Sequence, residues 1–263
     1  MMMRLTVTAP RRSTMHRSVR SRARRLVPAA AVIVLLVATS PSAAAGGKPG
    51  YPDTVTWRGE TWQVKTSRSP VGPGPNVFAR ENVSVDPATG DLHLQITRNA
   101  SGAWTTAEVI SPRSYGYGTY TFELDSRVDS FDPNVVLGLF TWSDKAPYAH
   151  REIDIEVARW GNAADTTNGQ YVVQPYDKAN HLRRFTQGAL GTSIQRFTWR
   201  AGSIAWETRD AANGLVASYT YTGAGVPVPG DERVRLNLWL YQGAAPSDGA
   251  PVDVAIRSFT FTP

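Results

Sequence analysis

The chain has 263 residues, no cysteine and a formal net charge of +6. Its first 45 residues hold eight arginines and no acidic residue, so the chain from Gly46 onward has 20 basic and 22 acidic residues and a formal charge of −2. A nearly neutral chain lacks the concentrated basic face with which proteins bind nucleic acid or an anionic membrane. We therefore expect neither of these as a partner of residues 46–263.

Residues 1–45 are predicted to be a secretory signal peptide. They combine an arginine-rich start, the apolar run PAAAVIVLLVA at 28–38 and a series of small residues that ends at Ala45. The apolar run is shorter than the roughly 20 residues of a membrane span, so we expect cleavage near Ala45 and secretion without a permanent anchor. The glycines and prolines of residues 46–54 predict a flexible lead-in to the folded chain.

One all-β domain is expected over residues 55–263, because short segments of alternating apolar and polar residues recur along it. The predicted strands lie at 92–97, 119–125, 135–142, 152–157, 171–176, 197–208, 216–222, 234–240 and 254–262. Turn residues occur at 86–90, 201–202 and 213–214. No segment has the periodicity of an amphipathic helix, so we predict an antiparallel β-sandwich of the jelly-roll type.

Three carboxylates stand at alternate positions of one predicted strand: Glu152, Asp154 and Glu156. Successive side chains of a strand point to opposite faces, so the three acids share one face while Ile153 and Ile155 share the other. Neighbouring like charges repel each other and give the fold no evident stability. The pattern therefore indicates chemistry at this strand.

Two other interpretations of the acids are open. Three carboxylates can hold calcium, but calcium sites are usually built on loops that also supply backbone carbonyls. The acids can also form a solvated acidic strand face. A zinc site and a serine nucleophile have no support, since the three histidines after residue 45 lack zinc-ligand spacing and no Gly-x-Ser-x-Gly sequence occurs. We expect no metal and no other cofactor.

Glycoside cleavage uses two carboxyl groups, which retaining enzymes hold about 5 to 5.5 Å apart. On a flat strand Glu152 and Glu156 would be roughly 13 Å apart, at about 3.3 Å per residue. The hypothesis therefore requires a curved sheet with both glutamates in a concave active-site cleft. Asp154 between them can share a proton or raise the pKa of a neighbour, so the three acids should titrate as a coupled set.

Side chains of other predicted strands are candidates for binding a sugar chain. In the segment 234–240, apolar residues alternate with Arg235, Asn237 and Trp239, which we place on the outer face. Trp142 and Gln174 are expected on the same surface. Four other tryptophans are predicted to fill the core: Trp57, Trp62, Trp199 and Trp206.

Four segments together resemble glycoside hydrolase family 16, the concanavalin A-like sandwiches that include lichenases, laminarinases, agarases, carrageenases and xyloglucan transglycosylases. They are YGYGTYTFEL (115–124), FTW (140–142), EIDIE (152–156) and RLNLWL (235–240), and the resemblance extends over about residues 55–262. It implies that Glu152 is the nucleophile, that Asp154 assists it and that Glu156 is the general acid and base, with retention of configuration.

The resemblance is closer to the lichenase and xyloglucan branch of the family, because the acid motif is uninterrupted. Two positions depart from lichenases: His150 stands where they have Trp, and Val157 stands where Phe is common. We therefore expect a secreted, monomeric, endo-acting retaining glycosidase whose partner is a β-linked polysaccharide of the β-glucan type. A transglycosylase with the same site, or a carbohydrate-binding sandwich without catalysis, are the alternatives.

Overall fold

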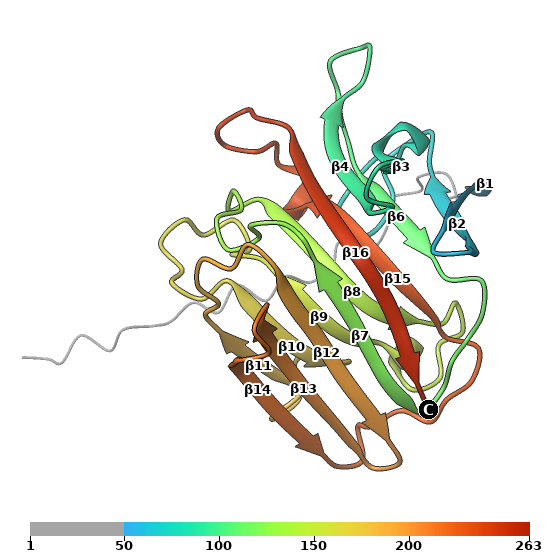
Figure 1. Cartoon of the computed structure of the whole chain (residues 1–263), viewed down its shortest axis with the longest axis vertical. Coiled ribbons are helices and arrows are strands. Elements are labelled where there is room, and N and C mark those ends of the chain that lie inside the picture. The colour runs from blue at the N-terminus through green and yellow to red at the C-terminus, as the bar shows by residue number, and fades with distance from the viewer. Residues whose placement is uncertain (1–49) are drawn as a thin grey trace, which may run out of the picture. The chain divides into compact units, whose positions relative to one another are not determined.

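The computed structural model describes residues 50–263, and Figure 1 shows that they form almost only β-strands. The signal peptide predicted at 1–45 lies outside these residues. Among the described residues, no helix is long and apolar enough to cross a membrane. The elements in chain order are β1 (Gly50–Trp57), β2 (Glu60–Thr66), η1 (Arg80–Asn82), β3 (Val83–Val85), β4 (Leu92–Arg98), β5 (Trp104–Thr105), β6 (Ala107–Ile110), β7 (Gly118–Leu124), β8 (Val135–Trp142), η2 (Ala149–Arg151), β9 (Ile153–Val157), β10 (Gly169–Val173), β11 (Leu182–Phe185), β12 (Ser193–Arg200), β13 (Ser203–Asp210), β14 (Leu215–Thr222), β15 (Arg233–Leu240), η3 (Tyr241–Gly243) and β16 (Val252–Thr262).

The strands form two sheets that pack face to face (Figure 1). The first sheet has the order β1-β2-β6-β15-β8-β9-β10-β11. The second has the order β14-β13-β12-β7-β16-β4-β3, with β5 paired to β4. The ladders between named strands are antiparallel, and β15 returns late in the chain to lie between β6 and β8. The predicted antiparallel jelly-roll sandwich is confirmed.

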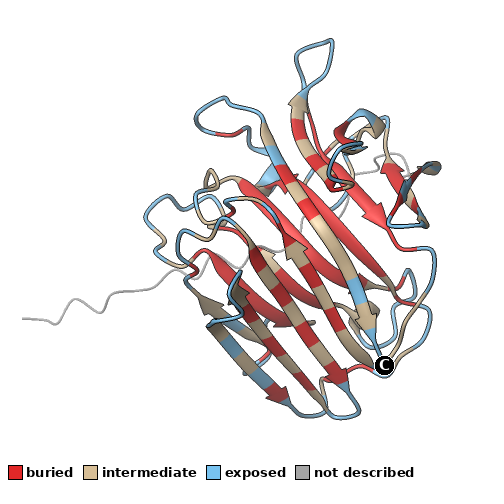
Figure 2. Cartoon of the chain, in the orientation of Figure 1, coloured by how far each residue is buried: buried red, intermediate tan, exposed pale blue. Residues whose placement is uncertain are grey.

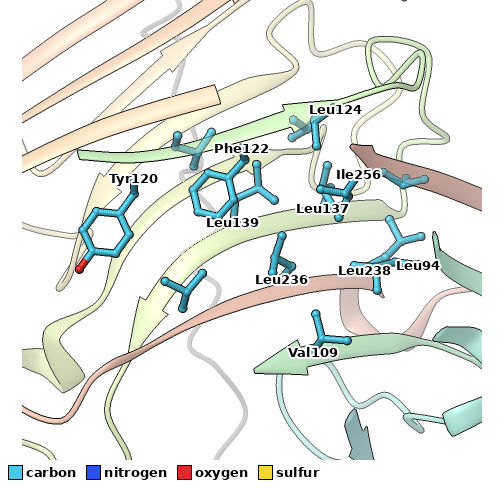
Figure 3. Packing of buried hydrophobic residues seen from close by; sticks show 14 of the residues in the cluster. Leu94, Val109, Tyr120, Phe122, Leu124, Leu137, Leu139, Leu236, Leu238 and Ile256 are labelled. Carbon is cyan, nitrogen blue, oxygen red and sulfur yellow. The ribbon is translucent and has the colours of Figure 1, made fainter. Parts of the chain in front are cut away.

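The core lies between the two sheets and is built from alternate residues of each strand. Leu137 and Leu139 of β8 and Leu236 of β15 point toward β7, where Phe122 meets them (Figure 3). Each large apolar side chain that is fully buried in this way contributes about 1.5 to 3 kcal/mol to folding. The four tryptophans predicted in the core are there and are at most 2 % exposed: Trp57, Trp62, Trp199 and Trp206.

The central strands of the first sheet are buried on both faces. In Figure 2 the strands of the second sheet alternate between buried and half-buried residues, whereas β8 and β15 are buried along almost their whole length. Figure 3 shows that these two strands bend, with the face turned away from the core on the inside of the bend. The sequence hypothesis requires the same curvature of β9, the strand that carries the acids and pairs with β8.

Several strand boundaries differ from the predictions. The lead-in predicted for 46–54 is wrong from Gly50 onward, because β1 pairs with β2 through main-chain hydrogen bonds that the mixed sequence GYPDTVTW did not indicate. The predicted strand 197–208 is two strands, β12 and β13, which a turn at Ala201–Gly202 separates. Gly202 has a φ of +76°, a left-handed conformation that glycine adopts without a steric penalty.

Candidate active site

The three acids lie at β9, in the middle of the first sheet, and share one face as predicted. Ile153 and Ile155 are fully buried in the core, so Asp154 and Glu156 point away from it, and Glu152 immediately precedes the strand. Asp154 is 3 % exposed, whereas Glu152 and Glu156 are half-buried. We call this outer surface of β6, β15, β8, β9, β10 and β11 the acid face.

Strand pairing places a row of residues across the acid face on either side of Glu156. Glu156 is opposite Gly138 of β8 on one side and opposite Gln170 of β10 on the other. Beyond them in the same row are Asn237 of β15 and Arg184 of β11. Four consecutive strands, β8 to β11, and the distant strand β15 thus bring one carboxylate, two amides and one guanidinium into one row.

Neighbouring rows position the other two acids. Asp154 is opposite Phe140 of β8, and Phe140 is opposite Arg235 of β15. The main chain of Glu152 accepts a hydrogen bond from the backbone N–H of Gln174, at 3.1 Å. Gln174 therefore lies beside Glu152 and Asp154 on the acid face.

Two glutamine side chains contact the acids directly. Gln170 Nε2 donates to Glu156 Oε2 at 2.6 Å, and Gln174 Nε2 donates to Asp154 Oδ2 at 3.4 Å. The side-chain amide oxygen of Gln170, Oε1, accepts hydrogen bonds from Trp160 Nε1 at 3.2 Å and from Arg184 Nη1 at 3.3 Å. These two donors fix the orientation of the amide, so that its N–H points at Glu156.

Burial raises the pKa values of all three acids, because an ionised carboxylate loses hydration on this face. Burial, and then the charge of Glu156, raise the pKa of Glu152 to about 8. Burial and the charges of both glutamates raise the pKa of Asp154 well above its usual range. Burial raises the pKa of Glu156 to about 7, although the Gln170 hydrogen bond and the Arg184 charge oppose this increase.

A hydrogen bond between Asp154 and Glu152 lowers the pKa of Glu152 and raises the pKa of Asp154. Asp154 therefore keeps its proton and donates a hydrogen bond to the Glu152 carboxylate. Two glutamates that titrate near neutral pH and one aspartate that stays protonated can supply a nucleophile and a proton donor at the same time. Because the groups are coupled, the pKa values describe the set of acids as a whole.

The predicted binding residues Trp142, Arg235 and Asn237 lie on the acid face or at its rim. Arg235 donates to Glu108 Oε1 at 3.1 Å and to Asp144 Oδ1 at 3.0 Å, and Asp144 also accepts from Trp142 Nε1 at 3.2 Å. Arg235 Nε and Asn237 Oδ1 are buried and have no hydrogen-bond partner among residues 50–263. A buried polar group of this kind gains free energy when a ligand hydroxyl pairs with it.

Trp239 also lies on the outer face, but other side chains cover most of it. It is 8 % exposed and belongs to a small apolar cluster with Phe78, Val136 and Ala158. The Trp160 ring lies 6.0 Å from it, centroid to centroid. Trp239 therefore supports one end of the acid face and presents little of its own ring to a ligand.

Sequence reasoning did not find several residues of the acid face. Gln170, Arg184 and Glu108 join it through strand pairing, which no local pattern reveals. Lys65 donates to Glu108 Oε2 at 2.7 Å, and burial lowers the pKa of Lys65. Gly138 had a local signal, because a glycine inside the apolar strand VVLGLFTW suggests a close approach of another group.

The described residues contain no cluster of metal-ligating side chains, and they form a cavity outside the acid face. Residues 50–263 contain no group of three or more His, Asp or Glu side chains with the geometry of a metal site. A cavity of about 440 Å³ is lined by residues of the β1–β2 hairpin, residues 113–115 and β16, and none of the three acids borders it. This cavity is thus separate from the acid face.

Comparisons with known proteins agree with the fold. No protein-family model matches the chain, and no curated protein matches its sequence. Among solved structures, a Bacillus licheniformis β-glucanase superposes with a TM-score of 0.61 and 23 % identity, covering 82 % of this chain and 99 % of that one. A β-1,3-1,4-glucanase (lichenase) from a mouse hindgut metagenome gives a TM-score of 0.58 with 23 % identity, covering 77 % and 92 %.

A third similar structure is a glycoside hydrolase family 16 endo-glucanase from Bacteroides ovatus. It superposes with a TM-score of 0.57 and 13 % identity, covering 76 % of this chain and 94 % of that one. At identities below 25 %, these likenesses establish a shared fold. They span nearly the whole of each solved structure, so the similarity covers the complete sandwich and is not limited to a few strands.

Proposed function

We propose that the chain is a family 16 glycoside hydrolase that is exported and cleaves internal bonds of a β-glucan with retention of configuration. The observation that carries the proposal is the set of three acids on one face at β9, with raised pKa values, Gln170 hydrogen-bonded to Glu156 and Gln174 hydrogen-bonded to Asp154. The shared sandwich of the β-glucanase and lichenase structures supports it. Export rests on the predicted signal peptide alone.

In the first step of the proposed reaction, the ionised Glu152 attacks the anomeric carbon. The glycosidic C–O bond breaks, and Glu156 gives its proton to the leaving oxygen. The products of this step are a glycosyl ester on Glu152, a free sugar end and an ionised Glu156. Protonation by Glu156 matters most for poor leaving groups, because these cannot depart as alkoxides.

In the second step, water attacks the same anomeric carbon while Glu156 accepts a proton from it. The ester bond to Glu152 breaks, so both glutamates return to their starting states and the product keeps the β configuration. The hydrogen bond from Asp154 stabilises the ionised carboxylate of Glu152. It therefore supports Glu152 both as the nucleophile of the first step and as the leaving group of the second. No other reactant is needed.

The substrate class is argued from the neighbours and from the binding residues. The solved structures named above are glucanases by their descriptions. The unpartnered atoms of Arg235 and Asn237 are one donor and one acceptor, which match the hydroxyls of a neutral sugar. Because Glu108 and Asp144 already neutralise Arg235, a neutral glucan fits this surface better than a sulfated polymer.

The test is a product analysis after incubation of the chain from Gly46 onward with barley β-glucan, laminarin, xyloglucan, agarose and carrageenan. The proposal expects rapid shortening of a β-glucan to short oligosaccharides. The folded variant Glu152→Gln, matched by circular dichroism, should bind the same glucan without cleaving it. Binding without products from the wild-type chain would instead identify a carbohydrate-binding sandwich, and products longer than the donor would identify a transglycosylase.

A further inference from the structure

The main chain enters Glu152 through a left-handed turn that contains no glycine. Tyr148, Ala149, His150 and Arg151 have φ values of 56°, 49°, 61° and 54°. Residues with a side chain rarely adopt this conformation, which costs roughly 1 to 2 kcal/mol per residue. Four such residues in succession persist only where the surrounding structure holds them. The turn therefore depends on contacts that outweigh its strain.

One side chain contacts the main chain on both sides of Glu152. Thr141 Oγ1 donates a hydrogen bond to the carbonyl oxygen of Arg151 at 2.8 Å. Thr141 Oγ1 in turn accepts a hydrogen bond from the backbone N–H of Ile153 at 3.2 Å. The hydroxyl thus ties the end of the left-handed turn to the start of β9, with Glu152 between the two bonds.

The position of Thr141 in β8 makes a hydroxyl there unusual. Thr141 is fully buried and continues the core-facing row of Leu137 and Leu139, and it is opposite Val234 of β15. An apolar side chain would suit this row, and valine has nearly the shape of threonine. The hydroxyl is therefore explained by its two hydrogen bonds and not by packing.

Other contacts hold the turn further from Glu152. The N–H of Ser143 donates to the carbonyl oxygen of His150 at 2.7 Å, and the His150 ring stacks on Trp142 at 4.2 Å. Arg151 Nε donates to the carbonyl oxygen of Val228 at 2.9 Å. These contacts fix residues 150 and 151, whereas the Thr141 hydroxyl joins Arg151 to Ile153 at the start of β9.

We propose that Thr141 is a positioning residue of the reaction, whose hydroxyl holds the Glu152 carboxylate at its distance from the anomeric carbon. This inference rests on the proposed role of Glu152 as the nucleophile. A nucleophile must lie within about 3 to 3.5 Å of the atom it attacks, and a displacement of about 1 Å can reduce the rate 100-fold. When the hydroxyl is lost, the strained turn can relax and carry Glu152 with it.

The experiment compares Thr141→Val, which keeps the shape, with Thr141→Ser, which keeps the hydroxyl. Steady-state kinetics on the β-glucan that the wild type cleaves would give kcat and KM, and thermal unfolding would give Tm. The matched control is Thr105→Val in β5. Thr105 Oγ1 also donates to a backbone carbonyl, that of Thr97, and accepts from Asn82 Nδ2, but it is remote from the acids in strand order.

We expect Thr141→Val to lower kcat about 10- to 100-fold, with KM changed less than about twofold, and Thr141→Ser to restore most of the rate. Thr105→Val should lower Tm by a similar amount and leave kcat unchanged. Wild-type kcat in Thr141→Val, or equal losses of kcat in both valine variants, would overturn the inference. A wild type that cleaves no glycan would instead remove the proposed function, and this inference with it.

Discussion

At the scale of single residues, the acid face depends on partners that set the charge of each carboxyl group. Glu156 illustrates this most clearly, since burial raises its pKa while Gln170 and Arg184 lower it. A general acid works best when its pKa is close to the working pH. Gln170 and Arg184 thus bring the pKa of the buried Glu156 down toward neutral pH.

Replacing Gln170 with methionine should move the alkaline limb of the pH–rate profile to higher pH. The change removes the hydrogen bond that stabilises ionised Glu156, so the pKa of Glu156 rises above about 7 and the acid keeps its proton to higher pH. The measurement is kcat/KM against pH for both proteins. An alkaline limb that stays in place or moves down would contradict the assigned role of Gln170.

The wild-type profile itself should be bell-shaped with a maximum near neutral pH. The productive form has Glu152 ionised and Glu156 protonated. Because the pKa of Glu152, about 8, is higher than that of Glu156, about 7, this form is the less populated of the two singly protonated forms, and its share is largest midway between the two values. Activity should decline as pH falls below this range, when both are protonated, and as it rises above, when both are ionised. A maximum near pH 4, the ordinary range of exposed carboxyl groups, would show that burial does not control these acids.

The alternation in EIDIE was enough to predict that its three acids share one face, because successive side chains of a strand point to opposite faces. Sequence could not supply Gln170, Arg184 or Glu108, because strand pairing brings them to the site and no local pattern shows which strands pair or in what register. It also could not show that Phe78 and Trp160 cover Trp239, since both come from segments outside the predicted strands.

At the scale of the strand, β8 supplies the central line of the acid face, and Gly138 is its most constrained position. A Cβ atom at Gly138 would lie 2.5 Å from Asn237 Oδ1, so the absence of a side chain lets the amide lean over β8 toward β9. Asn237 Oδ1 is one of the unpartnered buried atoms. The glycine thus determines where a ligand-binding group sits.

The substitution Gly138→Ala should raise KM for the glucan several-fold by displacing the Asn237 amide, and should lower stability by about 1 to 3 kcal/mol through overpacking. The control is Gly188→Ala, since a Cβ atom there would have no neighbour within 4 Å. KM from initial rates and Tm from unfolding provide the comparison. Unchanged KM in Gly138→Ala would show that Asn237 does not contact the substrate.

Strand prediction succeeded where the apolar signal was strong, as in the almost continuously apolar β8, and failed where it was weak. The predicted strand 135–142 coincides with β8. β1 and β2 were missed because their pairing, and not a pattern of apolar residues, defines them, and β11 was missed because LRRF is too short to show a period. Edge strands such as β11 carry less of the core and therefore less sequence signal.

At the scale of the whole molecule, the acid face should reduce stability at neutral and alkaline pH. The folded-state pKa of Glu156 is raised above its unfolded value, so its ionisation opposes folding as pH rises through about 7. Glu156→Gln removes that ionisation. We expect the variant to have a higher Tm than the wild type at pH 8, by at least about 2 °C, with the difference disappearing below about pH 4.5.

Thermal unfolding at pH 4 and pH 8 measures this effect without any assay of activity. Equal Tm values for the wild type and Glu156→Gln at pH 8 would contradict the raised pKa of Glu156. The expected gain in stability on loss of the proposed general acid is typical of sites where function opposes folding. The two packed sheets, with one continuous core between them, are large enough to tolerate this local cost.

The most direct test of the account is to trap the glycosyl–enzyme intermediate. A β-glucosyl oligosaccharide with fluorine at C2 and a good leaving group slows the second step more than the first, so the ester accumulates. Proteolysis and mass spectrometry then locate the sugar. We predict one sugar bound to Glu152 in the wild type and none in Glu152→Gln; a sugar on Glu156, or turnover of the glucan without any covalent adduct, would contradict the account.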